Sequence, residues 1–105
     1  MAGASMGLHE DEARLGPEVL DIHRAVVSIQ EELEAADWYN QRAHATDDRD
    51  LAAILEHHRD EEKEHAAMLL EWVRRHDPAF DRHLHRYLFT ERDIIEIEHA
   101  AEQEG

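Results

Sequence analysis

The second half of the chain carries an apolar stripe whose centre is occupied by ionisable side chains. Residues spaced three and four apart lie on one face of an α-helix. The stripe with these spacings consists of Leu51, Ile54, Leu55, His58, Glu62, His65, Leu69 and Trp72. Such a helix must bury this face against another element, which then has to accommodate the carboxylate of Glu62 and the imidazole of His65. This requirement constrains the fold more than any other feature of the sequence.

An earlier stripe predicts the partner helix. Its members, again at spacings of three and four, are Val19, Ile22, Val26, Ile29, Leu33 and Ala36. Gly16-Pro17-Glu18 is typical of a helix start, because Pro fits the first helical position and Glu suits the positive end of the helix dipole. We expect this helix to reach Arg42 or Ala43, with Glu32 at the edge of its apolar stripe.

The breaks around the second stripe set the fold class. Ala45-Thr46-Asp47-Asp48 separates the two stripes, and Thr46 or either Asp can cap the following helix. That helix should end near Asp77-Pro78, because the residue before Pro disfavours the α region. With only two Pro and four Gly, the chain is predicted to be all-α: an antiparallel two-helix hairpin plus a short C-terminal helix.

The two ends of the chain carry weaker patterns. We expect residues 1–15, which are small, polar and acidic, to form a flexible N-terminal tail. Residues 16–105 should form the hairpin domain with its C-terminal helix. A short helical or irregular crossing segment is indicated by Phe80, Leu84, Tyr87 and Leu88. Asp93 belongs to a capping pattern, and a short third helix should run from about Glu91 to Ala101 or beyond.

The geometry of a hairpin places carboxylates from both helices at one height. If the turn centres near Asp47, Glu32 lies 15 residues before it and Glu62 lies 15 residues after it. At a rise of about 1.5 Å per residue, both lie roughly 22 Å from the turn, and His65 stands about one turn further on. One Glu from one helix and a Glu-x-x-His from the next make half the ligand set of a di-iron carboxylate bundle.

Core-facing carboxylates need a compensating partner, because burying an unpaired charge is costly. A Glu could be neutral, or it could pair with Arg from a neighbouring element. However, the first stripe offers no core-facing Lys or Arg, and Arg59 and Lys63 lie off the centre of the second. A divalent cation accepts carboxylates and a neutral imidazole together. We therefore favour Glu32, Glu62 and His65 as metal ligands.

A single chain of this kind is incomplete. It supplies three ligands, and a two-helix hairpin has too few elements to cover its apolar stripes. A twofold dimer would form a four-helix arrangement and double the set to two copies each of Glu32, Glu62 and His65. Glu62 could then bridge two metals while the other two ligands terminate each. Metal would stabilise this dimer by mass action.

The remaining acidic residues have two interpretations. Glu31 and Glu34 share one side of the first helix with Trp38. The outer flank of the second helix carries His57, Glu61 and Glu64. Both groups are explained by a solvated charged face, or alternatively by a path that attracts cations towards the buried site. His58, one turn before Glu62, is interpreted as a neighbour that supports a ligand or as a core histidine, rather than as an extra ligand.

Composition narrows the function classes. Eleven Lys and Arg against 26 Asp and Glu give a formal net charge of −15, which disfavours nucleic acid and anionic membranes and favours cations. Ten His are potential metal ligands. The absence of Cys excludes disulfides and thiolate sites. No apolar run approaches the roughly 20 residues of a membrane span. Met1 to Gly7 lack the features of a signal peptide, so we expect a cytoplasmic protein.

The sequence resembles a known family, the encapsulated ferritins, which are ferroxidases packaged inside encapsulin shells. The matching segments are His23-Arg24-Ala25, Glu31-Glu32-Leu33-Glu34-Ala35 through Asp37-Trp38-Tyr39, Arg59-Asp60-Glu61-Glu62-Lys63-Glu64-His65-Ala66, Leu70-Glu71-Trp72 and Tyr87-Leu88-Phe89-Thr90-Glu91. They run from about residue 19 to residue 97. The combination is specific, whereas Glu-x-x-His alone would be a weak signal.

The resemblance implies a ferritin-like four-helix arrangement completed by dimerisation, and a ring-shaped decamer of five dimers. It implies oxidation of Fe(II) to Fe(III) by dioxygen at a di-iron centre, with iron stored inside an encapsulin nanocompartment in the cytoplasm. Carried over residue by residue, the resemblance implies that the iron ligands are Glu32, Glu62 and His65, with Tyr39 beside the centre. It places Glu31 and Glu34 at the metal entry, near Trp38. It also implies an outer metal site, where calcium is possible, formed by His57, Glu61 and Glu64.

One departure from the family concerns the C-terminus. Family members usually carry a short apolar Gly-Ser-Leu-type peptide that docks to the shell, whereas this sequence ends at Glu102-Gln103-Glu104-Gly105. The encapsulin partnership therefore follows from the resemblance alone. Two other functions remain open at this point. One is a non-catalytic acidic helical module that binds metal or dimerises, and the other is a di-iron or di-manganese peroxidase, because the ligand set alone does not choose the oxidant.

Overall fold

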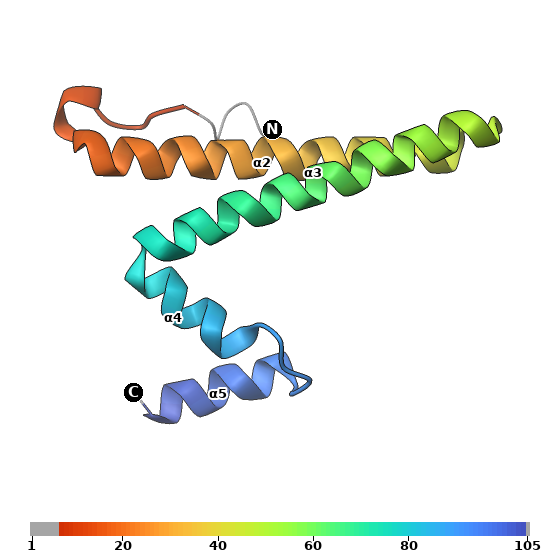
Figure 1. The fold of residues 1–105 in the computed structure, drawn as a ribbon. Coiled ribbons are helices and arrows are strands. Elements are labelled where there is room, and N and C mark those ends of the chain that lie inside the picture. The colour runs from red at the N-terminus through yellow and green to blue at the C-terminus, as the bar shows by residue number, and fades with distance from the viewer. Residues whose placement is uncertain (1–6, 105) are drawn as a thin grey trace. The chain divides into compact units, whose positions relative to one another are not determined.

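The computed structural model describes residues 7–104, and every regular element in this range is helical (Figure 1). The elements are a short 3-10 helix, η1 (Glu12–Arg14), and the α-helices α2 (Gly16–Ala45), α3 (Arg49–His76), α4 (Pro78–Tyr87) and α5 (Ile94–Glu104). The predicted all-α class is confirmed. The chain forms two compact units that divide between Val73 and Arg74, and each is described separately below.

The start of α2 follows the predicted signals. Pro17 lies in the first turn and Glu18 adds a negative charge there, where the helix dipole favours it. Gly16 has a φ of 77°, a left-handed conformation that side chains other than glycine rarely adopt. The backbone conformation at the start of this helix is therefore one that only glycine adopts without strain. The helix runs 30 residues, two or three residues past its expected end.

The turn between α2 and α3 consists of residues 46–48 and centres on Asp47, as expected. Of the three candidate caps, the structure selects Asp48. Its Oδ1 atom accepts hydrogen bonds from the backbone N–H groups of Asp50 at 2.9 Å and Leu51 at 3.0 Å. Thr46 instead stabilises the turn itself, because its Oγ1 accepts the N–H of Asp48 at 3.2 Å. The turn is thus closed by local side chains.

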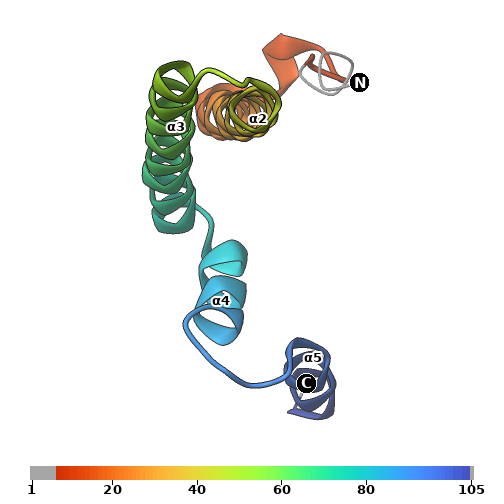
Figure 2. The ribbon, with the colours of Figure 1, turned by 90° about the vertical axis from the view of Figure 1, so that its right-hand side faces the viewer.

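The helices α2 and α3 lie side by side as an antiparallel hairpin (Figure 2). A direct hydrogen bond joins them, from Nη1 of Arg59 to Oδ1 of Asn40 at 3.0 Å. The buried residues on these helices are mostly small: Ala25, Ala36, Ala43, Ala66 and Val73. Small side chains allow two helix backbones to approach closely, and they leave little apolar volume in the core. The predicted hairpin is confirmed, but its core is thin.

Much of the predicted apolar surface is not covered within one chain. The exposed large side chains of the hairpin include Val19, Val26 and Leu33 on α2, and Leu51, Ile54 and Met68 on α3. Leu33 and Ile54 are 55% and 54% exposed, and Met68 is 65% exposed. Ala36 is the buried member of the two predicted stripes, whereas the other buried residues of the hairpin lie beside the stripes and many of the larger stripe residues face out. An exposed apolar surface of this kind is typical of an interaction face.

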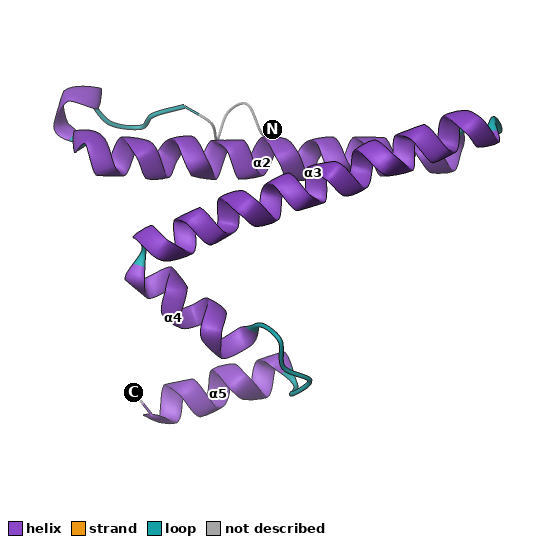
Figure 3. Cartoon of the chain, viewed as in Figure 1, coloured by secondary structure: helices purple, strands orange, loops and turns teal. Residues whose placement is uncertain are grey.

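The helix α4 replaces the segment that was expected to be helical or irregular (Figure 3). Asp77 is its N-cap, because its Oδ1 accepts the N–H of Phe80 at 3.0 Å. Pro78 occupies the first helical position, where its missing N–H costs nothing. The Asp-Pro step therefore ends α3 and starts α4 within two residues.

The last helix begins at Ile94, three residues later than expected, because Asp93 caps it. Oδ1 of Asp93 accepts the N–H of Glu96 at 3.1 Å. Ile97 is the buried residue of α5. Polar contacts also stabilise this second unit: Arg86 Nη2 lies 3.8 Å from Glu104 Oε2. None of the described helices combines the length and apolar character that crossing a membrane requires.

The predicted N-terminal tail over residues 1–15 lies partly outside the described residues, since residues 1–6 are not described. Residues 7–15 contain η1, whose N-cap Asp11 accepts the N–H of Ala13 at 3.1 Å. The flexibility of this segment stays a prediction.

Candidate metal centre

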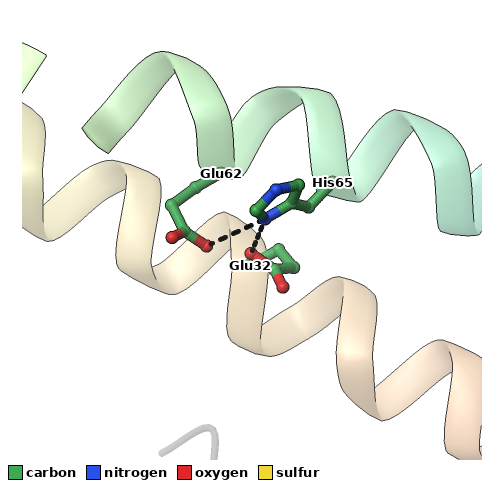
Figure 4. Close-up of side chains that lie close together, drawn as sticks. All are labelled: Glu32, Glu62 and His65. Atoms are coloured by element: carbon green, nitrogen blue, oxygen red, sulfur yellow. Dashed lines mark ion pairs between the residues drawn. The ribbon is translucent and has the colours of Figure 1, made fainter. Parts of the chain in front are cut away.

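Three side chains from two helices converge in the middle of the hairpin (Figure 4). Glu32 comes from α2, and Glu62 and His65 come from α3. Nδ1 of His65 lies 3.5 Å from Oε2 of Glu32 and 3.9 Å from Oε2 of Glu62. One potential ligand atom from each residue lies within 4.8 Å of the others. These separations exceed good hydrogen-bond lengths, so the three groups surround a point rather than bond to one another.

The burial of these residues is uneven. The side chains of Glu32 and Glu62 are 25% and 23% exposed, whereas that of His65 is 46% exposed. Oε2 of Glu32 is buried without a hydrogen-bond partner. Within residues 7–104, no hydrogen bond compensates for the desolvation of this carboxylate oxygen. The site is therefore closed on the carboxylate side and open on the histidine side.

The arginine that could neutralise these carboxylates is used elsewhere. Arg59 donates through Nη1 to Asn40 and through Nε to Asp60 at 2.9 Å. Its hydrogen bond lowers the pKa of the Asp60 carboxyl below its usual value, and the same bond raises the pKa of the Arg59 guanidinium. In the described part of the chain, two carboxylates and one imidazole thus remain together without a Lys or Arg partner. This donor set fits a divalent transition-metal ion.

Tyr39 and His58 form a second contact between the same two helices. Their rings stack with centroids 5.3 Å apart and planes inclined by 22°. The guanidinium carbon of Arg42 lies 5.7 Å from the centre of the Tyr39 ring, within the range of a cation–π contact. His58 was interpreted from sequence as a support or a core residue. In the single chain it is exposed; its ring stacks on Tyr39 and meets the ring of His57 edge-on, with centroids 6.1 Å apart.

The other predicted site residues do not join a three-ligand group within one chain. Nε2 of His57 lies 2.7 Å from Oε1 of Glu61, with side chains 69% and 49% exposed. Glu64 is also exposed. On α2, Glu31 is exposed, Glu34 is half-buried and Trp38 is 48% exposed. Across residues 7–104, Glu32, Glu62 and His65 are the group whose potential ligand atoms all lie within 4.8 Å of one another.

Comparison with known proteins decides the family. Residues 7–91 match the model of the EncFtn-like family. The chain belongs to the EncFtn-like family. An encapsulated ferritin-like protein of Rhodospirillum rubrum is 56% identical over 100 residues, which cover 95% of this chain and 71% of that protein. The resemblance to the encapsulated ferritins is therefore confirmed.

A structural comparison shows the same relationship. The crystal structure of a protein from Nitrosomonas europaea matches this EncFtn-like chain with a TM-score of 0.81 at 60% identity, covering 84% of this chain and 97% of the other. A shorter match, 44% identical over 57 residues, is to an encapsulin nanocompartment cargo protein of Myxococcus xanthus, covering 54% of this chain and 44% of that protein. This chain thus shares its helical fold with the Nitrosomonas europaea protein.

Proposed function

We propose that this protein is a ferroxidase that oxidises Fe(II) to Fe(III), with dioxygen as the electron acceptor, at a di-iron centre shared by two copies of the chain. The observation that carries the proposal is the convergence of Glu32, Glu62 and His65, where Oε2 of Glu32 has no hydrogen-bond partner among the described residues. Iron is the substrate at this centre, and Fe(II) accepts both oxygen and imidazole ligands.

The charge of the ligands explains why this set favours oxidation. Coulomb attraction grows with the charge of the cation, and it is stronger in a partly desolvated site than in water. Two carboxylates per chain therefore stabilise Fe(III) more than Fe(II). In this proposal Glu32, Glu62 and His65 hold iron, and Tyr39 lies beside the centre. The high negative charge of the chain, −15, would attract Fe(II) over longer distances.

A second copy of the chain completes the site. One hairpin supplies three ligands and leaves His65 open to solvent. Ile54 lies on the same face of α3 as His65, because eleven residues correspond to just over three complete turns, and it is 54% exposed. A twofold partner placed on this face would cover the apolar side chains and contribute its own three ligands.

The acidic residues outside the centre are assigned to iron handling. Glu31 and Glu34, close to Trp38 in sequence, would line metal entry. The outer group would bind a second cation, such as calcium, through His57, Glu61 and Glu64. Glu34 is half-buried and the remaining carboxylates are exposed, which is compatible with exchange of a hydrated ion. Both assignments rest on the family resemblance.

Assembly and location extend the same proposal. Five dimers would close into a ring-shaped decamer that works inside an encapsulin nanocompartment in the cytoplasm. The names of two relatives support the encapsulin location: one is an encapsulated ferritin-like protein, and the other is an encapsulin nanocompartment cargo protein.

The experiment that tests the proposal is oxidation of Fe(II) in air, followed by absorbance, with the parent chain and the Glu62→Ala variant. Glu98→Ala, at an exposed position of α5, is the matched control. We expect oxidation to be fast in the parent and the control and slow in Glu62→Ala. If Glu62→Ala oxidises Fe(II) as fast as the parent, the assignment of the centre is wrong.

One observation favours a different function, a non-catalytic module that only binds metal or dimerises. If protonated, His65 could itself pair with both carboxylates at the observed distances of 3.5 and 3.9 Å. The number of metal ions bound by each dimer separates the two functions. Two iron ions per dimer, lost in His65→Ala, support the ferroxidase. A dimer that binds no metal and does not dissociate when a chelator is added supports the alternative.

A further inference from the structure

The contact between Tyr39 and His58 lies between the same two helices as the candidate metal centre, seven residues away along each helix. Tyr39 lies seven residues after Glu32 on α2, and His58 lies seven residues before His65 on α3. Because the helices run antiparallel, both pairs occur at the same register of the hairpin. Seven residues correspond to about two turns, or roughly 10 Å. The stacked rings therefore form the next contact between α2 and α3, about two turns closer to the turn that joins these helices.

His58 contacts Tyr39 through the face of its ring. The centroid separation of 5.3 Å and the inclination of 22° describe an offset stack of two aromatic rings. His58 is not a member of the three-residue ligand group, whose atoms lie within 4.8 Å of one another. Stacking is thus the contact that distinguishes His58 from His65, although the two occupy equivalent positions on α3.

The stack links Tyr39 to the helix that carries two of the three ligands. Tyr39 is half-buried, and its ring could otherwise adopt another side-chain rotamer. Arg42, at 5.7 Å from the ring centre, lies on α2 like Tyr39, so its contact cannot fix the ring relative to α3. The contact with His58 can, because His58 belongs to the same helix as Glu62 and His65.

We propose that His58 is a positioning residue that holds the Tyr39 ring by stacking on it, and thereby fixes the phenol that the proposed function assigns to the metal centre. The consequence for activity rests on the proposed ferroxidase function, whereas the stack itself does not. A misplaced group near a reacting centre slows a reaction even when every ligand is present. Phenylalanine at position 58 should therefore preserve the function of the histidine, because it keeps a flat ring that can stack, whereas alanine should not.

The first test is a nuclear magnetic resonance spectrum of ring-labelled tyrosine in metal-free protein. The chain has two tyrosines, Tyr39 and Tyr87, so a Tyr87→Phe background leaves one signal. We expect His58→Ala to shift the Tyr39 ring resonance, because the ring current of the neighbouring imidazole is lost, and His58→Phe to keep a ring-current shift. His99→Ala, exposed on α5, is the control. An unchanged resonance in His58→Ala overturns the proposal.

The second test compares Fe(II) oxidation and the number of bound metal ions in the same variants. We expect His58→Ala to bind as much metal as the parent but to oxidise it about tenfold more slowly, within the range seen for misplaced groups. His58→Phe should restore the rate. Combining His58→Ala with Tyr39→Phe should add little to the slower single variant, because His58 acts through the Tyr39 hydroxyl, which Tyr39→Phe removes. Circular dichroism and native mass confirm that each variant is folded and assembled.

Each contrary outcome has a distinct meaning. Loss of a bound metal in both His58 variants makes His58 a ligand and overturns the positioning role. Equal rates in the parent and in His58→Ala overturn it as well, and leave the ferroxidase intact. A parent protein that does not oxidise Fe(II) overturns the ferroxidase, and the effect on rate falls with it.

Discussion

Nδ1 of His65 lies 3.5 Å from Oε2 of Glu32, although the two residues are 33 positions apart in sequence and belong to different helices. That oxygen is buried and has no hydrogen-bond partner. The carboxylate of Glu32 should therefore destabilise the metal-free protein and stabilise the metal complex. Stability measurements can therefore test the centre without reference to activity.

The Glu32→Gln substitution should change stability with opposite signs in the two states. In the presence of a chelator we expect the free energy of unfolding to rise by about 1 kcal/mol, because a neutral amide costs less to bury than a carboxylate. With Fe(II) bound under anaerobic conditions, the variant should be less stable than the parent, because a ligand is lost. Thermal unfolding measures both. Glu56→Gln, exposed on α3, should behave like the parent, and a loss of stability in both states would argue against a metal at Glu32.

Metal should stabilise the parent chain in proportion to its affinity. A ligand that binds only the folded state at about a hundred times its dissociation constant adds about 2.7 kcal/mol. We expect the unfolding temperature to rise on anaerobic addition of Fe(II), and this rise to disappear in His65→Ala. Differential scanning calorimetry measures the effect. An equal rise in the parent and in His65→Ala would place the stabilising metal elsewhere.

The exposed apolar face of α3 should be needed for assembly. Ile54 is 54% exposed in one chain and lies on the face that carries His65. If a second copy covers it, Ile54→Glu removes the benefit of burying the side chain, roughly 1.5–3 kcal/mol per copy, and adds a buried charge. We expect native mass spectrometry to show smaller assemblies, with oxidation reduced in parallel. His99→Glu on α5 is the control, and an unchanged assembly in Ile54→Glu would exclude this face from the interface.

The turn offers a matched pair of aspartates. Asp48 accepts two backbone N–H groups at the start of α3, so Asp48→Ala should lower the free energy of unfolding by about 1 kcal/mol, the usual value of an N-cap. Asp47, in the middle of the same turn, is exposed, and Asp47→Ala should have a much smaller effect. Urea unfolding of the two variants measures the difference. Equal effects would contradict the selection of Asp48 as the cap.

Local signals in the sequence were sufficient for the helices. The Gly16-Pro17 start, the turn around Asp47 and the Asp77-Pro78 step each act through backbone geometry within a few residues, so their effects are visible in sequence. The boundaries were less accurate where several residues competed for one role. Asp93 starts α5 at Ile94 rather than near Glu91, and Asp48 was one of three possible caps, because only the folded turn shows which carboxylate reaches the free N–H groups.

The convergence of the candidate ligands was also predictable, because equal distances from one turn bring Glu32 and Glu62 to one height on antiparallel helices. The Tyr39–His58 stack was not predicted. Its signal was the heptad that separates His58 from His65 and Glu32 from Tyr39, but spacing alone does not show that two rings face each other.

The sequence by itself determined the helical class, the hairpin and the face on which acid and histidine meet, because helical periodicity and capping are local properties. Only the tertiary structure decided that Oε2 of Glu32 lacks a hydrogen-bond partner among the described residues, that Arg59 is engaged by Asn40 and Asp60, and that many of the larger apolar residues of the stripes remain exposed. These properties depend on which side chain from the second helix occupies the space beside the first, and that is settled only when the two helices pack.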